Sequence, residues 1–228
     1  RLYDNPLLTA AGQQEIRGLS RRHGLAVASL TGDCFMQFPL WKAAGAERAA
    51  LERDFIAIAR ACHAVGIRQI VVPLVDNGSM ATPAQEDSLV DFLLAQAGLF
   101  AELDQQVVFE CDYRPAELGR FIGRLPADRF AINYDIGNSA ALGYDPAEEF
   151  AAYGDRIANV HVKDRVLGGT TVPLGTGNAD FPKVFGLLLR WNYRGNYIMQ
   201  TARAQDGDHA AALARYKAMI DGWIAGAA

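Results

Sequence analysis

The sequence is poor in cysteine and in long apolar runs, and it lacks a basic stripe. Its three cysteines cannot all pair and show no CxxC spacing, which argues against a disulfide framework or a structural zinc site. No apolar run reaches the about 18 residues that a membrane helix needs, and the N-terminus has no secretory pattern, so we expect a cytoplasmic chain without membrane partners. Scattered lysines and arginines on a chain of net charge −4 argue against nucleic-acid binding.

The remaining composition is that of an ordinary globular protein. Of the 228 residues, 50% are hydrophobic and 21% are charged, so the chain can bury a large core. No low-complexity segment or shift in composition divides it. We therefore predict a single domain over residues 1–228.

Short apolar segments alternate with amphipathic segments along the whole chain. The apolar segments have strand length, and in the amphipathic ones apolar residues recur at spacings of three and four, as on a buried helix face. This alternation predicts parallel βαβ units. The predicted strands are 25–30, 67–75, 105–113, 130–138, 157–164, 172–175 and 196–201, and the predicted helices are 9–23, 46–65, 83–103, 116–125, 146–153, 181–191 and 208–223.

Two observations favour a (β/α)8 barrel over a doubly wound sheet. A doubly wound nucleotide-binding sheet normally has a glycine-rich turn after its first strand, whereas GGTT at 168–171 and LGTG at 174–177 come late. Polar residues also follow most predicted strands, and in a barrel these strand ends meet at one mouth, where barrel enzymes carry their active sites. Because seven strands are counted, we expect the first strand of the barrel to precede the opening helix, outside the given sequence.

The polar residues at three of these strand ends have the chemistry of metal ligands. Glu110, Asp135 and His161 each end a predicted strand, and a buried carboxylate is costly unless it is paired, protonated or bound to a cation. Taken singly, Glu110 could pair with Arg114 or Lys163. Asp135 could cap a helix, and His161 could bond a backbone carbonyl. Together the three strand ends supply mixed oxygen and nitrogen donors suited to Mn, Co, Zn or, less well, Mg.

Other polar residues close to the strand ends could bind a substrate. Asn77 and Asn138 could bind hydroxyl groups or only cap loops, and Lys163 lies on the same side of its strand as His161. If the substrate carries a phosphate, backbone N–H groups of the glycine-rich stretches could bind it beside a cation, although such stretches are often simple turns. The candidates for this phosphate site are Gly168, Gly169, Gly175, Gly177, Lys163, Arg165 and Arg203.

Several segments resemble the xylose isomerase-like TIM barrels, particularly their sugar-phosphate isomerase and epimerase branch. They are FECDY, NYDIGN, NVHVKDR and VPLGTGNADF, together with the last strand, and the resemblance extends over nearly the whole chain from Thr9. In that family, a glutamate, an aspartate, a histidine and a second glutamate at four strand ends hold a divalent metal that binds neighbouring oxygens of the sugar. The resemblance places the first three ligands on Glu110, Asp135 and His161, whereas the fourth position holds Gln200.

Gln200 is the main departure from the family pattern. A glutamine carbonyl can coordinate a hard cation, but it supplies no negative charge and takes no proton. The family's epimerases use two glutamates as acid and base on opposite sides of a sugar carbon, and here only Glu110 is left. The resemblance therefore implies isomerisation of a sugar or sugar phosphate rather than epimerisation. Glu110 would move a proton between neighbouring carbons through an enediolate held on the metal, with Lys163 as a second catalytic residue.

Three other functions are open at this point. A lyase or dehydratase acting on a sugar or inositol derivative would begin with the same proton abstraction but expel a hydroxyl group. A metal-dependent phosphodiesterase would need several histidines at strand ends, and only His161 is available. A degenerate barrel would keep the fold while Gln200 marks lost chemistry. Barrels of this kind often form homodimers, but no segment identifies an interface.

Overall fold

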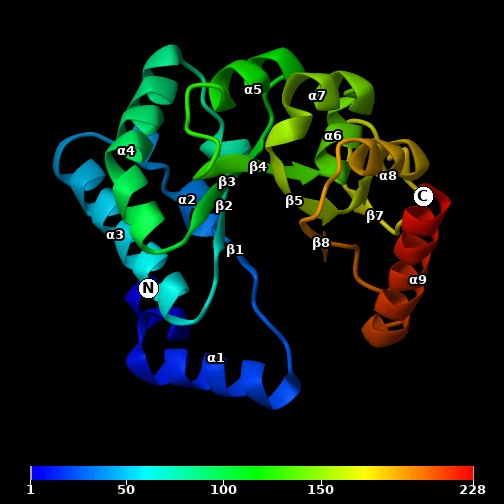
Figure 1. Cartoon of the computed structure of the whole chain (residues 1–228), viewed down its shortest axis with the longest axis horizontal. Helices are drawn as coiled ribbons and strands as arrows, with labels where there is room; N and C mark the ends of the chain where they lie inside the picture. Colours follow the sequence, from blue (N-terminus) through cyan, green and yellow to red (C-terminus); the bar gives the residue numbers. More distant parts are fainter. Residues whose placement is uncertain (1, 228) are drawn as a thin grey trace. The chain divides into compact units, whose positions relative to one another are not determined.

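The computed structural model describes residues 2–227, in which strands alternate with helices along the chain (Figure 1). Two compact units are distinguished by their internal contacts. The first extends to Cys111 and includes Gly123–Ala131, and the second comprises Asp112–Ile122 and the chain from Ile132 onward. The parallel strands follow the order β1-β2-β3 in the first unit and β4-β5-β8 in the second, which also holds a separate two-stranded ribbon, β6-β7.

In the first unit, long helices separate strands that pair in parallel. β1 pairs with β2, and β2 pairs with β3. Thr82 caps α4, because its side chain accepts a hydrogen bond from the N–H of Gln85, and Pro83 occupies the first turn, where it is well tolerated. The elements are η1 (Leu2–Asp4), η2 (Pro6–Leu8), α1 (Ala10–His23), β1 (Ser29–Thr31), α2 (Asp33–Gln37), η3 (Leu40–Lys42), α3 (Gly45–Ala64), β2 (Gln69–Leu74), η4 (Asp76–Gly78), α4 (Pro83–Glu102) and β3 (Gln106–Cys111).

An aromatic cluster fills the core of this first unit. The ring of Phe55 on α3 stacks on Phe35, with centroids 4.4 Å apart, and meets Phe92 and Phe100 of α4 edge-on at 5.3 and 6.1 Å. Phe100 in turn meets Phe130 at 5.9 Å. Burying a phenylalanine side chain contributes roughly 1.5–3 kcal/mol, so this cluster is a main stabilising contact between α3, α4 and the strands of the unit.

In the second unit, β5 pairs in parallel with β4 on one side and with β8 on the other. The helices α8 and α9 lie side by side (Figure 1), and the ring of Trp223 stacks on Phe181 at a centroid distance of 4.2 Å. The elements from the end of β3 onward are α5 (Pro115–Ile122), β4 (Phe130–Asp135), α6 (Ile136–Leu142), α7 (Pro146–Tyr153), η5 (Gly154–Arg156), β5 (Ile157–Val162), β6 (Asp164–Arg165), β7 (Thr171–Val172), α8 (Phe181–Arg190), β8 (Asn196–Met199) and α9 (His209–Ala227).

Three predicted strands differ from the structure. In the stretch 25–30, pairing begins only at Ala28, whose carbonyl accepts from the N–H of Gln69, and Leu25 is 69% exposed. The stretch 172–175 is not a barrel strand, because β7 pairs with β6 in an antiparallel hairpin. Among residues 2–227, six of the seven predicted strands are therefore parallel strands. The predicted strand 130–138 ends at Asp135, which caps the helix α6 that starts at the next residue.

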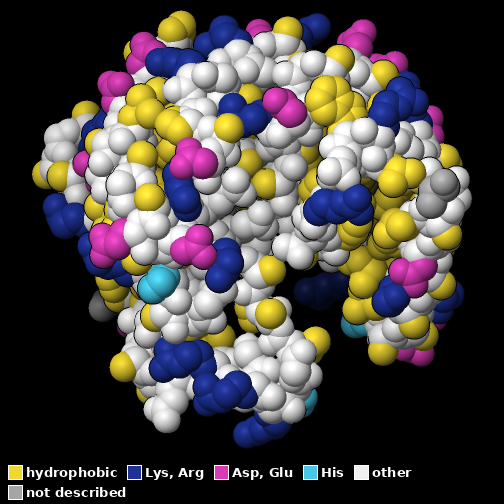
Figure 2. Space-filling model, in the orientation of Figure 1, with side chains coloured by type: hydrophobic (Ala, Val, Ile, Leu, Met, Phe, Trp, Pro, Cys, Tyr) yellow, Lys and Arg dark blue, Asp and Glu magenta, His cyan; other side chains and the backbone are white. Residues whose placement is uncertain are grey.

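The surface carries charges of both signs. Figure 2 shows Lys and Arg side chains mixed with Asp and Glu over most of the face drawn, with a gathering of basic side chains on α1. Arg21, Arg22 and His23 lie in the last turn of α1, where positive charge stabilises the negative end of the helix dipole. A local helix effect therefore accounts for this basic gathering. Among the described helices, none is long and apolar enough to cross a membrane.

Candidate metal centre

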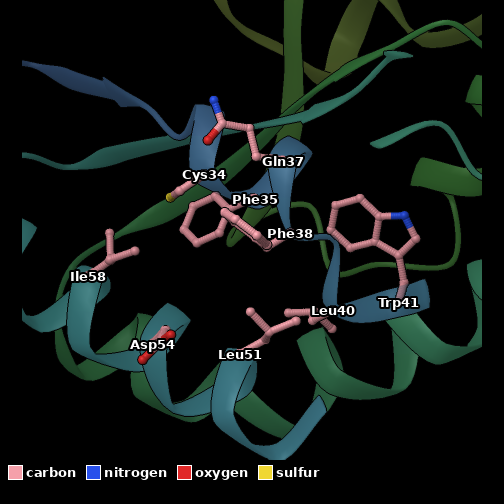
Figure 3. A pocket seen from close by; sticks show the side chains of 9 residues that line it. All are labelled: Cys34, Phe35, Gln37, Phe38, Leu40, Trp41, Leu51, Asp54 and Ile58. Atoms are coloured by element: carbon pink, nitrogen blue, oxygen red, sulfur yellow. The ribbon is translucent and has the colours of Figure 1, made fainter. Parts of the chain in front are cut away.

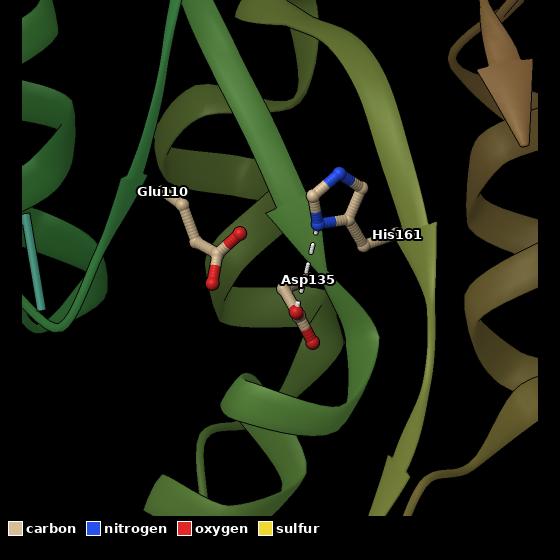
Figure 4. Close-up of side chains that lie close together, drawn as sticks. All are labelled: Glu110, Asp135 and His161. Atoms are coloured by element: carbon tan, nitrogen blue, oxygen red, sulfur yellow. Dashed lines mark ion pairs between the residues drawn. The ribbon is translucent and has the colours of Figure 1, made fainter. Parts of the chain in front are cut away.

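The strands β4 and β5 bring Asp135 and His161 side by side. The two residues lie opposite each other in the parallel register, and both are buried. His161 Nδ1 is 3.8 Å from Asp135 Oδ2, as the dashed line in Figure 4 indicates. Both residues lie toward the C-terminal ends of their strands, where barrel enzymes carry their active sites.

Two buried asparagines lie behind the His161 ring. Asn133 Nδ2 is 3.1 Å from His161 Nδ1, and Asn159 Nδ2 donates to Asn133 Oδ1 at 2.7 Å. Because Oδ1 of Asn133 accepts from Asn159, its amino group faces Nδ1, and Nδ1 therefore carries the lone pair. In this arrangement the lone pair of Nδ1 accepts the hydrogen bond from Asn133, and a metal ion could bind the same lone pair in its place. Asn133 was not among the predicted site residues, although it lies two residues before Asp135 and so on the same face of its strand.

Lys163 shares the carboxylate of Asp135. Its Nζ donates to Asp135 Oδ2 at 3.0 Å and to Asn138 Oδ1 at 3.3 Å. The lysine side chain passes so close to Gly137 that a Cβ added there would lie 2.7 Å from Lys163 Cγ. Gly137 thus provides the space in which Lys163 reaches Asp135.

The neighbours of Asp135 keep its carboxylate ionised. Burial alone would raise the pKa of Asp135, but the neighbouring His161 ring, the charge of Lys163 and the N–H of Asn138 outweigh it and hold the pKa below the ordinary value of 3.8. An anionic oxygen and a nitrogen lone pair therefore face each other inside the protein. A cation bound by both atoms would relieve this opposition, so the pair fits a metal ion.

Two further predicted ligands belong to β3 and to the end of β8. Glu110 lies in β3 and is only 7% exposed. Gln200 follows β8, and its Oε1 is buried without a hydrogen-bond partner among the described residues. Leaving a buried acceptor unsatisfied costs about 1–3 kcal/mol, which coordination of a cation would offset. Glu110, Asp135 and His161 can each offer one ligand atom to a metal, and Figure 4 draws their side chains.

Asp164 uses the N–H groups that we expected to bind a phosphate. Its buried carboxylate accepts from the N–H groups of Gly175 at 2.9 Å and Gly177 at 2.8 Å, and from a third N–H group of the same loop. A Cβ on Gly177 would come within 2.3 Å of Asp164 Oδ1, so glycine is needed there. The N–H groups of Gly168 and Gly169 donate to backbone carbonyls. The four glycine N–H groups of the expected phosphate site therefore all donate hydrogen bonds within the protein.

The other predicted substrate-binding residues have diverse surroundings. Asn77 is exposed in η4, where its Nδ2 donates to two backbone carbonyls of α2 at 3.1 Å each, which favours the capping role. Arg165 donates to Asn138 Oδ1 at 2.8 Å. Arg203 is exposed in the loop after β8. Contacts of these residues with a substrate stay predictions.

An apolar cavity of about 520 Å³ lies in the first unit between α2 and α3. Figure 3 shows Phe35 and Phe38 facing Leu51 and Ile58 across it. One carboxylate, that of Asp54, lines the cavity, and it accepts a hydrogen bond from the hydroxyl of Tyr3. Ligand sites need several converging polar groups to orient a ligand, and this lining does not provide them.

Similarity to known sequences extends to two sugar enzymes. An inosose dehydratase from Geobacillus kaustophilus is 28% identical over 142 residues, which cover 52% of this chain and 46% of that protein. The L-ribulose-5-phosphate 3-epimerase UlaE from Escherichia coli is 36% identical over 87 residues, or 38% of this chain and 31% of that protein. The chain thus spans less than half of the length of these relatives.

Similarity to solved structures covers almost the whole chain. A xylose isomerase domain protein from Planctomyces limnophilus has a TM-score of 0.76 at 19% identity, covering 95% of this chain and 84% of that one. An L-ribulose 3-epimerase has a TM-score of 0.76 at 18% identity, covering 93% and 80%. These likenesses confirm the barrel fold expected from the strand and helix pattern. Since residues 2–221 match the xylose isomerase-like TIM barrel family, the chain belongs to that family.

Proposed function

We propose that this chain is a divalent-metal-dependent isomerase or epimerase acting on a sugar or sugar phosphate, and that isomerisation is its main reaction. The observation that carries the proposal is the buried pair of Asp135 and His161. An ionised oxygen and a nitrogen lone pair lie 3.8 Å apart there, which suits a cation. The partnerless Oε1 of Gln200 adds a neutral oxygen donor.

The residues proposed to hold the metal are Glu110, Asp135, His161 and Gln200. Support for three of these ligands comes from the order of β4, β5 and β8 in the second unit, because the C-terminal ends of parallel strands lie along one edge. Glu110 occupies the corresponding end of β3 in the first unit. Two carboxylates, one imidazole and one amide oxygen suit Mn, Co or Zn better than Mg. When bound, such an ion would polarise the carbonyl group of the sugar.

In the proposed reaction, Glu110 acts as the base. It would remove the proton from the hydroxyl-bearing carbon next to the carbonyl group and return it to the carbonyl carbon. The proton of that hydroxyl group would pass to the former carbonyl oxygen, so that ketose and aldose interconvert. Lys163 uses two of its three N–H donors on Asp135 and Asn138, so one is left for the oxygen that gains charge. Epimerisation at one carbon needs an acid and a base on opposite faces of that carbon. Because Gln200 cannot take a proton, the second of these groups would be missing.

Metal content tests the ligand set. After dialysis against metal-free buffer, the wild type is expected to retain about one divalent metal per chain, and Glu110→Ala and His161→Ala to retain none. Glu102→Ala and His23→Ala, which change exposed residues of the same types, serve as matched controls and should retain the metal. A wild type that binds no metal when Mn, Co or Zn is supplied would contradict the proposal and favour a degenerate barrel.

Product analysis tests the reaction. Ketose and aldose should interconvert without inversion at C3 in the wild type, and Gln200→Glu should add inversion at C3 because it supplies the second base. Inversion at C3 without aldose formation in the wild type would contradict isomerisation.

A dehydratase is the second candidate, because the inosose dehydratase of Geobacillus kaustophilus is 28% identical over half of this chain. It would start from the same proton abstraction by Glu110 and then expel a hydroxyl group as water. Mass spectrometry of the product distinguishes the two reactions, since isomerisation conserves mass and dehydration removes one water molecule.

A further inference from the structure

We propose that Arg165, held by Asn138 beside Lys163, forms a subsite for an anionic group of the substrate, so that the enzyme prefers a keto sugar carrying a phosphate or carboxylate over a neutral one. This inference rests on the proposed sugar isomerase or epimerase function and names its substrate class. All three residues belong to the second unit, on α6 and at the C-terminal end of β5 and its continuation into β6.

Two cations bind one neutral oxygen in this cluster. Asn138 Oδ1 accepts from Arg165 Nη1 at 2.8 Å and from Lys163 Nζ at 3.3 Å. Bringing two positive charges to the same atom is unfavourable unless negative charge lies close by. The carboxylate of Asp135, bonded to Lys163, supplies that charge for only one of them, and it is also a proposed metal ligand.

Arg165 has no carboxylate partner among residues 2–227. Its Nε and Nη2 both donate to the carbonyl oxygen of Gly169, at 3.1 and 2.6 Å, and Nη1 donates to Asn138. A guanidinium carries five N–H donors, so two remain, one on each terminal nitrogen. Two terminal N–H groups can bind a phosphate or carboxylate in the bidentate manner.

The nearest acidic residue in the sequence does not neutralise this pair. Asp164 lies between Lys163 and Arg165, but alternation along the strand turns it to the opposite side, and its carboxylate accepts N–H groups from the 175–179 loop. The cluster therefore presents excess positive charge beside Asp135. An anionic group of the substrate would balance that charge, and the polar contacts that already fix Arg165 lower the entropy cost of binding it.

The alternative role of Arg165 is structural, because its bonds to Gly169 hold the β6–β7 hairpin closed. The test therefore compares Arg165→Gln and Arg165→Lys with Arg190→Gln, which removes an exposed arginine of the same unit. Thermal unfolding and metal content of each variant establish that the fold and the metal centre persist. The probes are a ketopentose, its 5-phosphate and a ketohexuronate.

Kinetics of the metal-loaded enzyme give the first readout. Losing a charge-assisted hydrogen-bonding partner costs about 1.5–3 kcal/mol, so Arg165→Gln is expected to raise the KM for the anionic sugars by about 10- to 100-fold. The KM for the neutral ketopentose should change less than about twofold, and Arg165→Lys should keep part of the preference because it keeps the charge. Equal effects on neutral and anionic sugars, or a wild type without preference for anions, would overturn the subsite.

Calorimetric titration of the metal-free protein with inorganic phosphate and with acetate gives a readout that does not depend on turnover. We expect the wild type and Arg190→Gln to bind the anion and Arg165→Gln not to bind it. This result supports the subsite even if no sugar is converted, and in that case only the proposed function fails. If the protein converts sugars but binds no anion, the subsite is contradicted and the proposed function is not. Tighter binding of phosphate than of acetate, or the reverse, identifies which anionic group the substrate carries.

Discussion

Asp135 and Glu149 are both buried carboxylates of the second unit, with exposed fractions of 4% and 1%, yet their electrostatics are opposite. Asp135 faces the ammonium group of Lys163, and its pKa lies below the ordinary value of 3.8. Glu149 has no cation within salt-bridge distance among the described residues and accepts hydrogen bonds from three hydroxyl groups. Burial raises its pKa above the ordinary value of 4.5, although those hydroxyl groups lower it.

The three hydroxyl groups around Glu149 explain its role. Tyr134 of β4 and Tyr153 of α7 donate to it at 2.7 and 2.8 Å, and Ser139 of α6 donates to the same carboxylate. Glu149 therefore links α7 to the strand and helix on either side of Asp135. The comparison teaches that burial alone does not distinguish a candidate site carboxylate from a structural one, whereas the charges beside the two carboxylates differ.

The largest difference between the two carboxylates should appear in metal binding. Loss of a residue that only supports a metal ligand weakens metal binding by about 10- to 100-fold. Asp135→Asn is expected to weaken Mn binding more than this, because it removes an anionic ligand itself. Glu149→Gln, the matched change at the other buried carboxylate, should alter Mn affinity much less. Calorimetric titration with Mn measures both, and equal affinities in the two variants would remove the distinction between them.

The next largest difference should appear in stability. Glu149→Leu leaves three hydroxyl groups without their acceptor, at about 1–3 kcal/mol for each buried group that stays unpaired, so the free energy of unfolding should fall by about 3 kcal/mol or more. The neighbouring Glu148 is exposed, and Glu148→Leu should change it by no more than about 0.5 kcal/mol. Urea unfolding at neutral pH measures both. A small effect at Glu149 would show that the hydroxyl groups find other partners.

Replacing the cation beside Asp135 should make the two carboxylates more alike. Lys163→Met removes a charge and a hydrogen bond that both lower the pKa of Asp135, so this pKa should rise. NMR titration of the Asp135 carboxyl group in the metal-free protein measures this shift. The control is Lys217→Met, since Lys217 pairs with Asp221 on the surface of α9. An unchanged Asp135 titration in Lys163→Met would assign the low pKa to the other neighbours.

The smallest expected effect is a pH dependence of opposite sign for the two groups. The folded-state pKa of Glu149 is raised, so between 4.5 and that higher pKa the native state binds more protons than the unfolded state, and stability falls as pH rises through this range. The pKa of Asp135 is lowered, so its contribution is present above 3.8 and is lost as pH falls through the lower folded-state value. Urea unfolding of the metal-free protein over about pH 3 to 8 should show a flatter high-pH limb in Glu149→Gln. The same slope in wild type and variant would mean that Glu149 titrates as it does in the unfolded chain.

Local patterns in the sequence were sufficient for most of the alternation of strands and helices, though not for α2, α6 or the β6–β7 hairpin. They were also sufficient to place Asp135 and His161 at strand ends. The pairing of residues across strands was not predictable, because the register that sets Asn133 opposite Asn159 depends on the sheet as a whole. The same limit explains why the glycine-rich loop was interpreted as a phosphate site. Nothing local to Gly175 indicates that the carboxylate of Asp164, eleven residues earlier, accepts its N–H group.

The Asp164 carboxylate has a further consequence for how the 175–179 loop behaves over time. The N–H groups of a phosphate-binding loop gain their acceptor when the phosphate binds. In this loop the carboxylate of Asp164 is the acceptor, so the loop is ordered when the chain folds. Ligand exchange should therefore leave the loop's conformational freedom unchanged. The Asp164 side chain thus takes the place that a bound anion takes in a phosphate-binding loop, and the loop should stay ordered whether or not a substrate is bound.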